Sequence, residues 1–515
     1  MSGDQFRVQS QGRAYAAVIG VTLGMLIAGL FIPLALGRTP ATISATSGET
    51  GDLSFTDGSG APGLPGATGD PGALPNGKPV KGGKNGAALP GGAALPGGGG
   101  GSGGSGAPNT PGAPGSPSPT ASGPLTASDQ GVTATTIKLG VILLDIESLR
   151  PLGFSQPRFS PAEQQEMAQA YIDNINKDGG ILGRKIVPVY ATINALDSNG
   201  SQSPAAVCSK LAEDEKVFAV VGYLNQAASC LTQQHRLPSW IDSSGIAELY
   251  TKSQNFLISP RANTERNGAN WGDLAARSGV LKGRTLGTVY MDNPDEARPE
   301  AALSAGLGEA GYDVAVHGKL ANDASTAQFQ LGTVVNQMRS AGVDTVFLST
   351  NFVLAIQFVQ TAESQGFRPQ YHVSDFGSLT AEGLIGGMPA SFDGAIAFTQ
   401  GGFVSKESAA DKGCREEFNR ATGKSAQPGT DSGSIRQFCF WMRSFAAAAR
   451  AAGADLTRTG LVSSVMGLGR VALPGLISGS FAAGKTDFGD AYRPMRFDRS
   501  CKCYKDAGGA QSGRY

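Results

Sequence analysis

The stretch AYIDNINKDGGILGRKI, residues 170–186, decides the fold. It completes an amphipathic helix, because apolar side chains from Met167 to Ile175 recur at helical spacing. Gly179 or Gly180 then supplies the left-handed backbone that ends many helices and that a residue with a Cβ resists. The chain reverses at once into the apolar run KIVPVYA. These features predict the tight helix-to-strand turn of an α/β unit, in which the glycines are structural and form no ligand loop.

Strands and helices alternate on both sides of this unit. TTIKLGVILL precedes it as a buried-strand run, and PAAVCSKLAEDE and KVFAVVGYL follow it as a helix and a strand. Farther along, GRTLGTVYM, YDVAVHG, VDTVFLST and QYHVSD are strands separated by helical segments. Such alternation predicts an α/β fold with two parallel sheets, each covered by helices on both faces. CREEFNRATG and SIRQFCFWMRSFAAAARAAG are predicted as helices that close the fold.

Composition excludes one class of partner and marks a spacer. Lys plus Arg and Asp plus Glu both number 42 among 515 residues, so a zero net charge gives no electrostatic case for nucleic-acid binding. From about Asp57 to Pro124 the chain is mostly Gly, Pro, Ala and Ser with few charges. Such a segment cannot bury a core, so it is predicted to be a disordered spacer.

An uncharged apolar run extends from Ala14 to Leu36. A helix that rises about 1.5 Å per residue can cross a hydrocarbon core of about 30 Å with a run of this length. Arg7 and Arg13 precede it, which predicts a cytoplasmic N-terminus and an extracytoplasmic remainder. The alternative is a cleaved signal peptide, whose apolar core is normally shorter, about 7–15 residues. No cysteine occurs before Cys208, so a lipid-modified cysteine does not hold the chain at the membrane.

Two glycine motifs imitate nucleotide-binding loops. GSFAAGKT, residues 479–486, matches the P-loop consensus, but that loop needs a following helix and DFGDAYRP follows here. We therefore predict no phosphate site and place Lys485 on a surface turn. GLGEAG, residues 306–311, ends a helix and precedes a strand, the reverse of the dinucleotide-binding order.

Catalytic and metal-binding patterns are weak. The three histidines, His235, His317 and His372, are scattered and have no motif around them. CKC stands without a second cysteine pair, so no zinc spacing is present. The chain is therefore predicted to be no enzyme and to use neither a metal nor a cofactor.

The six cysteines fall into sequence-local couples. An even number in an exported chain favours disulfides, whereas the alternative of buried free thiols suits a cytosolic protein. The predicted pairs are Cys208–Cys230 and Cys414–Cys439; a bridge between the third couple, Cys501 and Cys503, would close a very small, strained ring, so its pairing stays open.

Four segments together resemble the type I periplasmic solute-binding proteins, and most closely the branched-chain amino acid (Leu/Ile/Val) group of ABC importers. They are IKLGVIL, AYIDNINKDGGILGRKI, CSKLAEDEKVFAVVGYLNQAAS and GVDTVFLSTNFVLAIQFVQTAESQGFRP. The resemblance spans about Thr135 to Asp498, and GKTDFGDAYRPMRFD is similar to the closing hairpin of the family. It implies two Rossmann-like lobes, joined by crossover segments, that trap a ligand between them by hinge closure.

The chain thus divides into an anchor, a linker and two discontinuous lobes. The predicted ranges are a cytoplasmic N-terminus at 1–13, a transmembrane anchor at 14–36, a disordered linker at 37–130, lobe 1 at 131–278 plus 402–480, and lobe 2 at 279–401 plus 481–515.

Parallel sheets bind ligands beyond the carboxyl ends of their strands, so polar residues there are the candidate contacts. They are Asn225, Gln226, Ser243, Ser244, Asn293, Asn351 and Asp375. The resemblance implies that Ser243 and Ser244 suit an α-carboxylate, and that Asp375 stands where an acid binds the α-amino group. Asn225 and Gln226 depart from the hydroxyl-rich run of the family. The alternative role of each residue is a helix cap or a turn former.

Together these observations predict a single-pass protein of the cell membrane with an extracytoplasmic solute-binding domain. Its partners are a small polar ligand, such as an amino acid or related compound, and the permease of an ABC importer. The alternative is a sensory or regulatory subunit that uses the same fold but feeds no transporter.

Overall fold

The computed structural model describes residues 124–147, 159–194, 200–224, 226–242, 244–381, 385, 387–401, 407–429 and 432–514. All described residues belong to one compact unit. The predicted anchor and nearly all of the predicted linker lie outside these residues. Within the described ranges, no helix combines the length and the apolar character that crossing a membrane requires.

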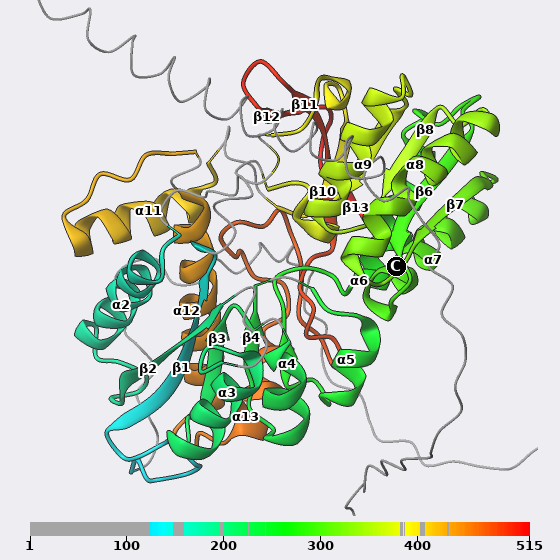
Figure 1. The fold of residues 1–515 in the computed structure, drawn as a ribbon. Helices are drawn as coiled ribbons and strands as arrows, with labels where there is room; N and C mark the ends of the chain where they lie inside the picture. The colour runs from blue at the N-terminus through cyan, green and yellow to red at the C-terminus, as the bar shows by residue number, and fades with distance from the viewer. Residues whose placement is uncertain are drawn as a thin grey trace, which may run out of the picture. The chain divides into compact units, whose positions relative to one another are not determined.

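The first sheet is parallel throughout and has the strand order β2-β1-β3-β4-β5 in the described residues (Figure 1). Its strands are β1 (Thr136–Asp145), β2 (Lys185–Asn194), β3 (Ala219–Gly222), β4 (Ser239–Ile241) and β5 (Leu257–Ile258). The parallel order confirms the α/β prediction for this half.

Helices from both ends of the folded region cover this sheet, and we call the assembly lobe 1. The early helical elements are α2 (Pro161–Lys177), α3 (Pro204–Ser209), η3 (Lys210–Asp214), α4 (Ala227–Ser229), η4 (Cys230–Gln234) and α5 (Ala247–Lys252). The late ones are α11 (Ala409–Thr422), α12 (Ser432–Ala452) and α13 (Arg458–Gly467). α12 packs against α2 and β3, so the late helices close the core of the early strands, as predicted.

The helix-to-strand turn at the end of α2 forms as predicted. Ser160 and Glu163 make a reciprocal capping box at the start of this helix. At its other end the N–H of Gly180 donates to the carbonyl oxygen of Ile175 at 2.8 Å, with φ at +72°. A Cβ on Gly180 would lie 2.0 Å from the carbonyl oxygen of Arg184, so only glycine fits there. The basic end of the turn is buried, because the Arg184 guanidinium donates to three backbone carbonyls.

The second sheet is mixed, with the order β12-β11-β10-β9-β8-β6-β7 and β13 pairing with β11 in the described residues. Its strands are β6 (Leu286–Met291), β7 (Val314–Leu320), β8 (Thr345–Leu348), β9 (Gln370–Ser374), β10 (Ile396–Thr399), β11 (Ala491–Asp498), β12 (Cys503–Asp506) and β13 (Gln511–Ser512). β6 to β10 are parallel, whereas β11 runs antiparallel to β10, β12 and β13. The closing hairpin is therefore formed by β11 and β12.

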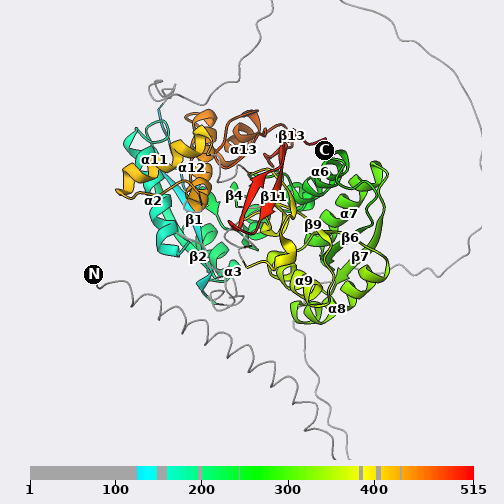
Figure 2. The ribbon, with the colours of Figure 1, turned by 90° about the horizontal axis from the view of Figure 1, so that it is seen from above.

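The helices beside this sheet complete what we call lobe 2 (Figure 2). They are α6 (Thr264–Arg277), α7 (Pro294–Glu309), α8 (Ala324–Ser340), α9 (Phe352–Ser364) and the short η5 (Phe376–Ser378) and η6 (Ala390–Phe392). The sequence assigned α6 to lobe 1, but the structure packs it on α7, with Trp271 in a lobe 2 core. A Cβ on Gly306 would lie 2.4 Å from the carbonyl oxygen of Ala269, so glycine permits this close approach. The chain thus crosses to lobe 2 before α6.

Three segments cross between the lobes in the described part of the chain: 259–263, 400–408 (of which 402–406 are not described) and 468–490. They contact one another, since Ser259 bridges to Asp487 and Gly401 bridges to Leu476. The amide N–H of Ala262 donates to Gln400 Oε1 at 2.8 Å, which ties the first crossover to the second.

Both predicted disulfides are present, and the couple whose pairing the sequence left open is also bridged. Cys208–Cys230 joins α3 to η4 in lobe 1, and Cys414–Cys439 joins α11 to α12. Cys501–Cys503 lies where β11 turns into β12. Sulfur separations of 2.05, 2.04 and 1.93 Å identify covalent pairs.

Candidate functional site

The carboxyl ends of β3 and β4 lie side by side in lobe 1. Gly222 pairs with Ile241 in the parallel register, so the loops that follow these strands leave the same edge of the sheet. Gln226 and Ser244 lie in these loops, while the predicted contacts Asn225 and Ser243 fall outside the described residues. Gln226 is exposed, Ser244 is half-buried, and neither side chain has a hydrogen-bond partner within the described ranges. These side chains keep their donors and acceptors available.

Several aromatic side chains pack together beside the carboxyl ends of β3 and β4, and the sequence analysis did not identify them. The Tyr223 ring lies edge-to-face with Phe159 and Trp441, with centroids 5.3 and 5.2 Å apart. The indole Nε1–H of Trp441 donates to the carbonyl oxygen of Ile241 at 3.2 Å. Burial raises the pKa of Tyr223, so its phenol stays neutral. Helix α12 thereby fixes the ends of both strands.

The ends of β6 and β8 in lobe 2 also carry the predicted asparagines, but both side chains cap helices. Asn293 Oδ1 accepts from the backbone N–H of Glu296 at the start of α7, and its amide donates to Asn322. Asn351 Oδ1 accepts from the N–H of Leu354 at the start of α9, and its amide donates to Glu296 Oε1 at 3.2 Å. The alternative role of helix cap is therefore observed at both positions.

Asp375 follows β9, as the sequence predicts, and its side chain is only 1% exposed. One carboxylate oxygen accepts from the hydroxyls of Thr380 and Thr399, each at 2.6 Å. The other accepts from the backbone N–H of Gln400 at 2.6 Å and lies 3.7 Å from Arg261 Nε. Asp375 therefore joins the end of β9 to the second crossover and faces a cation from the first.

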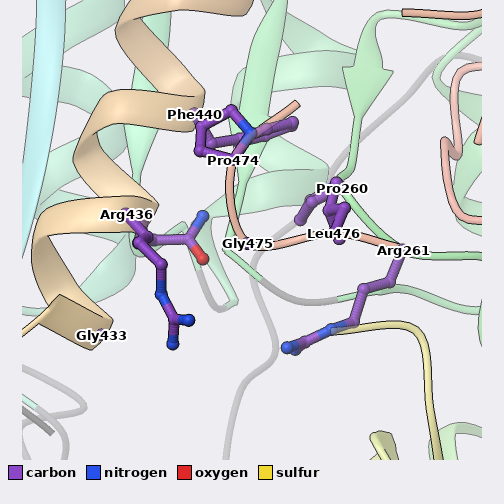
Figure 3. Close-up of a pocket in the computed structure, with 9 residues that line it drawn as sticks. Pro260, Arg261, Gly433, Arg436, Phe440, Pro474, Gly475 and Leu476 are labelled. Carbon is purple, nitrogen blue, oxygen red and sulfur yellow. The ribbon is translucent and has the colours of Figure 1, made fainter. Parts of the chain in front are cut away.

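A small cavity adjoins these crossovers, and sequence reasoning missed it. Its volume is about 80 Å³. It is lined by Pro260, Arg261, Gly433, Arg436, Gln437, Phe440, Pro474, Gly475 and Leu476. Figure 3 shows the side chains of Arg436 from α12 and Arg261 from the first crossover reaching toward the same open side. These residues are far apart in the chain, so no local sequence signal marks them as a group.

The P-loop look-alike lies within the third crossover. Ala482 and Lys485 face each other across a tight antiparallel turn, and the chain proceeds to β11 rather than to a helix. Lys485 ends this turn, whose residues 482–484 are exposed as a surface turn requires, but its side chain is half-buried and engaged with neighbouring backbone. Its ammonium group donates to the carbonyl oxygens of Ser480, Asp487 and Phe488 and pairs with Asp490 at 3.1 Å. The lysine therefore fastens the crossover, and burial lowers its pKa.

The histidines do not form a catalytic group among the described residues. His235 faces Glu213, His317 contacts Glu300, and His372 is buried in β9 against Phe347. Cys208, Cys230 and His235 lie close enough together to hold a metal ion, but a disulfide occupies both sulfurs. That bond removes the thiolates that a metal would need.

Comparisons with known proteins agree with this architecture. A family model described as "Periplasmic binding protein" matches residues 158–500. No curated protein sequence matches the chain. Several hundred solved chains share the fold.

Three solved structures illustrate this similarity. Their sequence identity to this chain is low, so they show only that the fold is shared. A substrate-binding protein from Desulfitobacterium hafniense in complex with Leu is 16% identical, covers 72% of this chain and 99% of its own, and has a TM-score of 0.54. A fatty acid ABC transporter substrate-binding protein from Thermomonospora curvata is 17% identical, covers 76% of this chain and 95% of its own, and has a TM-score of 0.56. A solute-binding protein from R. palustris in complex with 4-hydroxybenzoate is 15% identical, covers 74% of this chain and 98% of its own, and has a TM-score of 0.57.

Proposed function

The chain belongs to the periplasmic binding protein family, which confirms the resemblance seen in its sequence, and from this premise we propose that it captures a small organic solute between its two lobes for an ABC importer. The family is one of binding proteins, not of enzymes. One observation carries the proposal for this chain: polar side chains at the end of the lobe 1 sheet are unengaged, and a rigid aromatic layer supports them. Polar side chains without a protein partner, placed beyond the carboxyl ends of parallel strands, are available to a ligand in the position where such sheets bind one.

We assign the ligand contacts of lobe 1 to Asn225, Gln226, Ser243 and Ser244. Amides and hydroxyls both donate and accept hydrogen bonds, so these groups suit a small polar head group. Asn293, Asn351 and Asp375 form the facing side in this proposal. Their side chains are engaged with protein groups, so on this side the ligand meets helix starts and the Arg261–Asp375 pair.

The ligand class is a small amino acid or organic acid. The structures reported above hold leucine or 4-hydroxybenzoate, or are called fatty acid binding. Each of these compounds carries a carboxyl group on a largely apolar body. The shared group suits the donors of lobe 1.

A thermal-shift screen tests the proposal. A ligand that binds only the folded state stabilises it by mass action and so raises the melting temperature. At a ligand concentration one hundred times Kd, the added stability is about 2.7 kcal/mol. We expect at least one amino acid, amide, polyol or organic acid to raise the melting temperature of residues 124–515. Gln226→Ala should reduce that shift, whereas Gln330→Ala on α8 of lobe 2 should not. The absence of any shift across the panel would contradict the proposed function.

We further propose that residues 14–36 tether this domain to the cell membrane, with the lobes on the extracytoplasmic side. The uncharged run and the preceding Arg7 and Arg13 support this orientation. Fractionation should leave the full chain in the membrane, and protease added outside should cut the spacer. A soluble product that lacks the residues before about Ala45 would contradict the tether and leave the export intact.

A further inference from the structure

We propose that the Cys501–Cys503 disulfide is a thiol–disulfide exchange site that oxidises a dithiol on a partner molecule. This activity goes beyond solute capture and does not depend on it. The two cysteines lie on either side of Lys502 in the turn between β11 and β12. Cys501 and Lys502 are exposed and Cys503 is half-buried, so a thiolate in solution can reach the bond.

The disulfides of lobe 1 are shielded by comparison. Cys208, Cys414 and Cys439 are fully buried in the cores of that lobe. Cys230 is partly buried and packs against the same core as Cys208. A thiolate must approach a sulfur atom in order to attack it, so burial protects these two bonds. The exposed bond of lobe 2 is thus the accessible one.

Stability does not explain the exposed bond. The chain-entropy contribution of a disulfide rises with the number of residues that it encloses, and the bonded cysteines are only two positions apart. Other contacts hold the hairpin closed, since β12 pairs with β11 along its whole length. The rings of Phe497 and Tyr504 lie 5.4 Å apart, and the Tyr504 hydroxyl donates to the carbonyl oxygen of Leu379 at 2.8 Å. The hairpin therefore does not need the disulfide to form.

The turn holds the bond under strain that reduction relieves. A bridge between cysteines so near in the chain closes a very small ring, and departures from relaxed geometry make a disulfide easier to reduce. Lys502, inside this ring, has φ at +54°, the left-handed region that a residue with a Cβ occupies at a cost in free energy. Strained or exposed disulfides have the more oxidising reduction potentials. The bond is therefore an electron acceptor.

Local charge favours a thiolate, which is an anion. The stretch 498–505 contains three cations, Arg499, Lys502 and Lys505, and one acid, Asp498. Asp498 pairs with Lys505 and accepts from backbone N–H, so the exposed Lys502 keeps its positive charge beside the sulfurs. A neighbouring cation stabilises both the attacking thiolate and the thiolate that leaves.

A dithiol balances the exchange. One thiolate of the partner attacks Cys501 Sγ, forms a mixed disulfide and displaces Cys503 as a thiolate. The second thiolate of the partner then attacks the partner's own sulfur, which closes the partner's disulfide and releases Cys501. Two electrons pass to the cysteine pair, which takes up the two protons that the partner's thiols lost. The carbonyl oxygen of Asp498, 3.4 Å from Cys501 Sγ, can accept a hydrogen bond from the new thiol.

The exchange site lies at the opposite end of the lobe 2 sheet from the proposed solute contacts. β10 begins at Ile396, which pairs with Arg496 of the antiparallel β11, and ends at Thr399, which pairs with Arg493. The turn that follows Asp498 therefore lies beside the start of β10. The solute contacts lie beyond the carboxyl ends of the parallel strands, so exchange can be measured without a solute.

Exchange kinetics with a reduced synthetic peptide, which carries two cysteines separated by two residues, test the proposal. The oxidised full chain is mixed with the peptide, alkylation traps free thiols at intervals, and mass spectrometry measures each cysteine and the peptide disulfide. We expect Cys501 and Cys503 to become reduced about a hundredfold faster than the cysteines of lobe 1, with one peptide disulfide formed for each reduced pair. Oxidised glutathione, an exposed disulfide without ring strain, should react with the peptide about tenfold more slowly.

Two further variants test the turn and the fold separately. Lys502→Glu should slow the exchange about three- to tenfold, because it repels the attacking thiolate. Lys282→Glu, at an exposed lysine between α6 and β6 of the same lobe, should leave the rate within about twofold. The double variant Cys501→Ser/Cys503→Ser should form no peptide disulfide and keep its melting temperature within about 3 °C of the wild type.

Exchange no faster than that of oxidised glutathione would make the bond an ordinary surface disulfide and overturn the proposal. Equal reduction rates for all the disulfides would do the same. A double serine variant that fails to fold would show that the bond is a structural staple. None of these results bears on solute capture, which the thermal-shift screen tests independently.

Discussion

The two sheets present polar residues at equivalent places, just after their strands, yet those residues have different roles. In lobe 1, Gln226 and Ser244 have no hydrogen-bond partner among the described residues. In lobe 2, Asn293 and Asn351 cap helices, and Asp375 clamps the end of β9 to a crossover. A polar residue after a strand therefore has two possible functions, and only its partners distinguish them. We infer that lobe 1 provides direct ligand contacts and lobe 2 provides rigidity.

The largest expected effect is at Asp375. Asp375→Ala leaves two hydroxyls, one backbone N–H and the Arg261 guanidinium without their acceptor in a nearly solvent-free place. We expect stability to fall by about 3–5 kcal/mol in urea unfolding. Asp313→Ala, an exposed acid of the same lobe, should change it by less than about 0.5 kcal/mol. Equal effects of the two substitutions would remove the structural role that we assign to Asp375.

The second prediction concerns the pH dependence of stability, which should differ between the lobes because His372 lies in lobe 2. This histidine is fully buried in lobe 2, and burial, followed by Arg496 and Arg284, lowers its pKa from 6.5 to about 3. The unfolded chain binds a proton below pH 6.5 and the native chain does not, so stability falls as the pH decreases from 6.5 toward 3.

Between pH 7.5 and pH 5 this single group should remove about 2 kcal/mol of stability. His372→Phe should reduce the slope of stability against pH in that window, since a phenyl ring can pack on Phe347 without titrating. Hydrogen exchange at pH 5 should show β9 of lobe 2 losing protection before β1 of lobe 1. An unchanged slope in the variant would exclude His372 as its origin.

A smaller effect is expected at the helix cap Asn351. Asn351→Ala removes the acceptor of the Leu354 N–H and the donor to Glu296, so lobe 2 should lose about 1 kcal/mol of stability. Asn351→Ser keeps a capping oxygen and should recover part of this loss. If ligand affinity fell by more than tenfold in the serine variant while stability recovered, Asn351 would be a ligand contact and the contrast between the lobes would weaken.

The smallest effect on stability is expected at Gln226. Because its side chain is exposed and unpaired in the described part of the chain, Gln226→Ala should change the unfolding free energy by less than about 0.5 kcal/mol. Its effect should instead appear in ligand affinity, measured by titration with the compound found in the screen. A loss of stability with unchanged affinity would reverse the roles of the two lobes at this position.

Local patterns were sufficient for the elements but not for the site. The Gly180 turn, helix α2 and the lobe 1 strands β1, β2 and β3 follow from spacing and backbone sterics, and all were predicted. The strand β5 was missed because a two-residue run carries no periodicity, and β10 was missed as well. α6 was placed in the wrong lobe, since its apolar face fits either core until the glycine contacts with α7 are known.

Sequence by itself determined the alternation of strands and helices, the pairing of four of the six cysteines and the family, because each depends on residues that are near in the chain or fixed in type. Only the tertiary structure decided which polar residues are engaged. Arg261 pairs with Asp375 and lines one cavity with Arg436 although 175 positions separate the two arginines, and the Lys485 ammonium group binds backbone carbonyls of the third crossover from the end of its surface turn. The partners of a charged group depend on its burial and on which distant segments pack beside it at the crossovers. Local spacing in the sequence encodes neither of these.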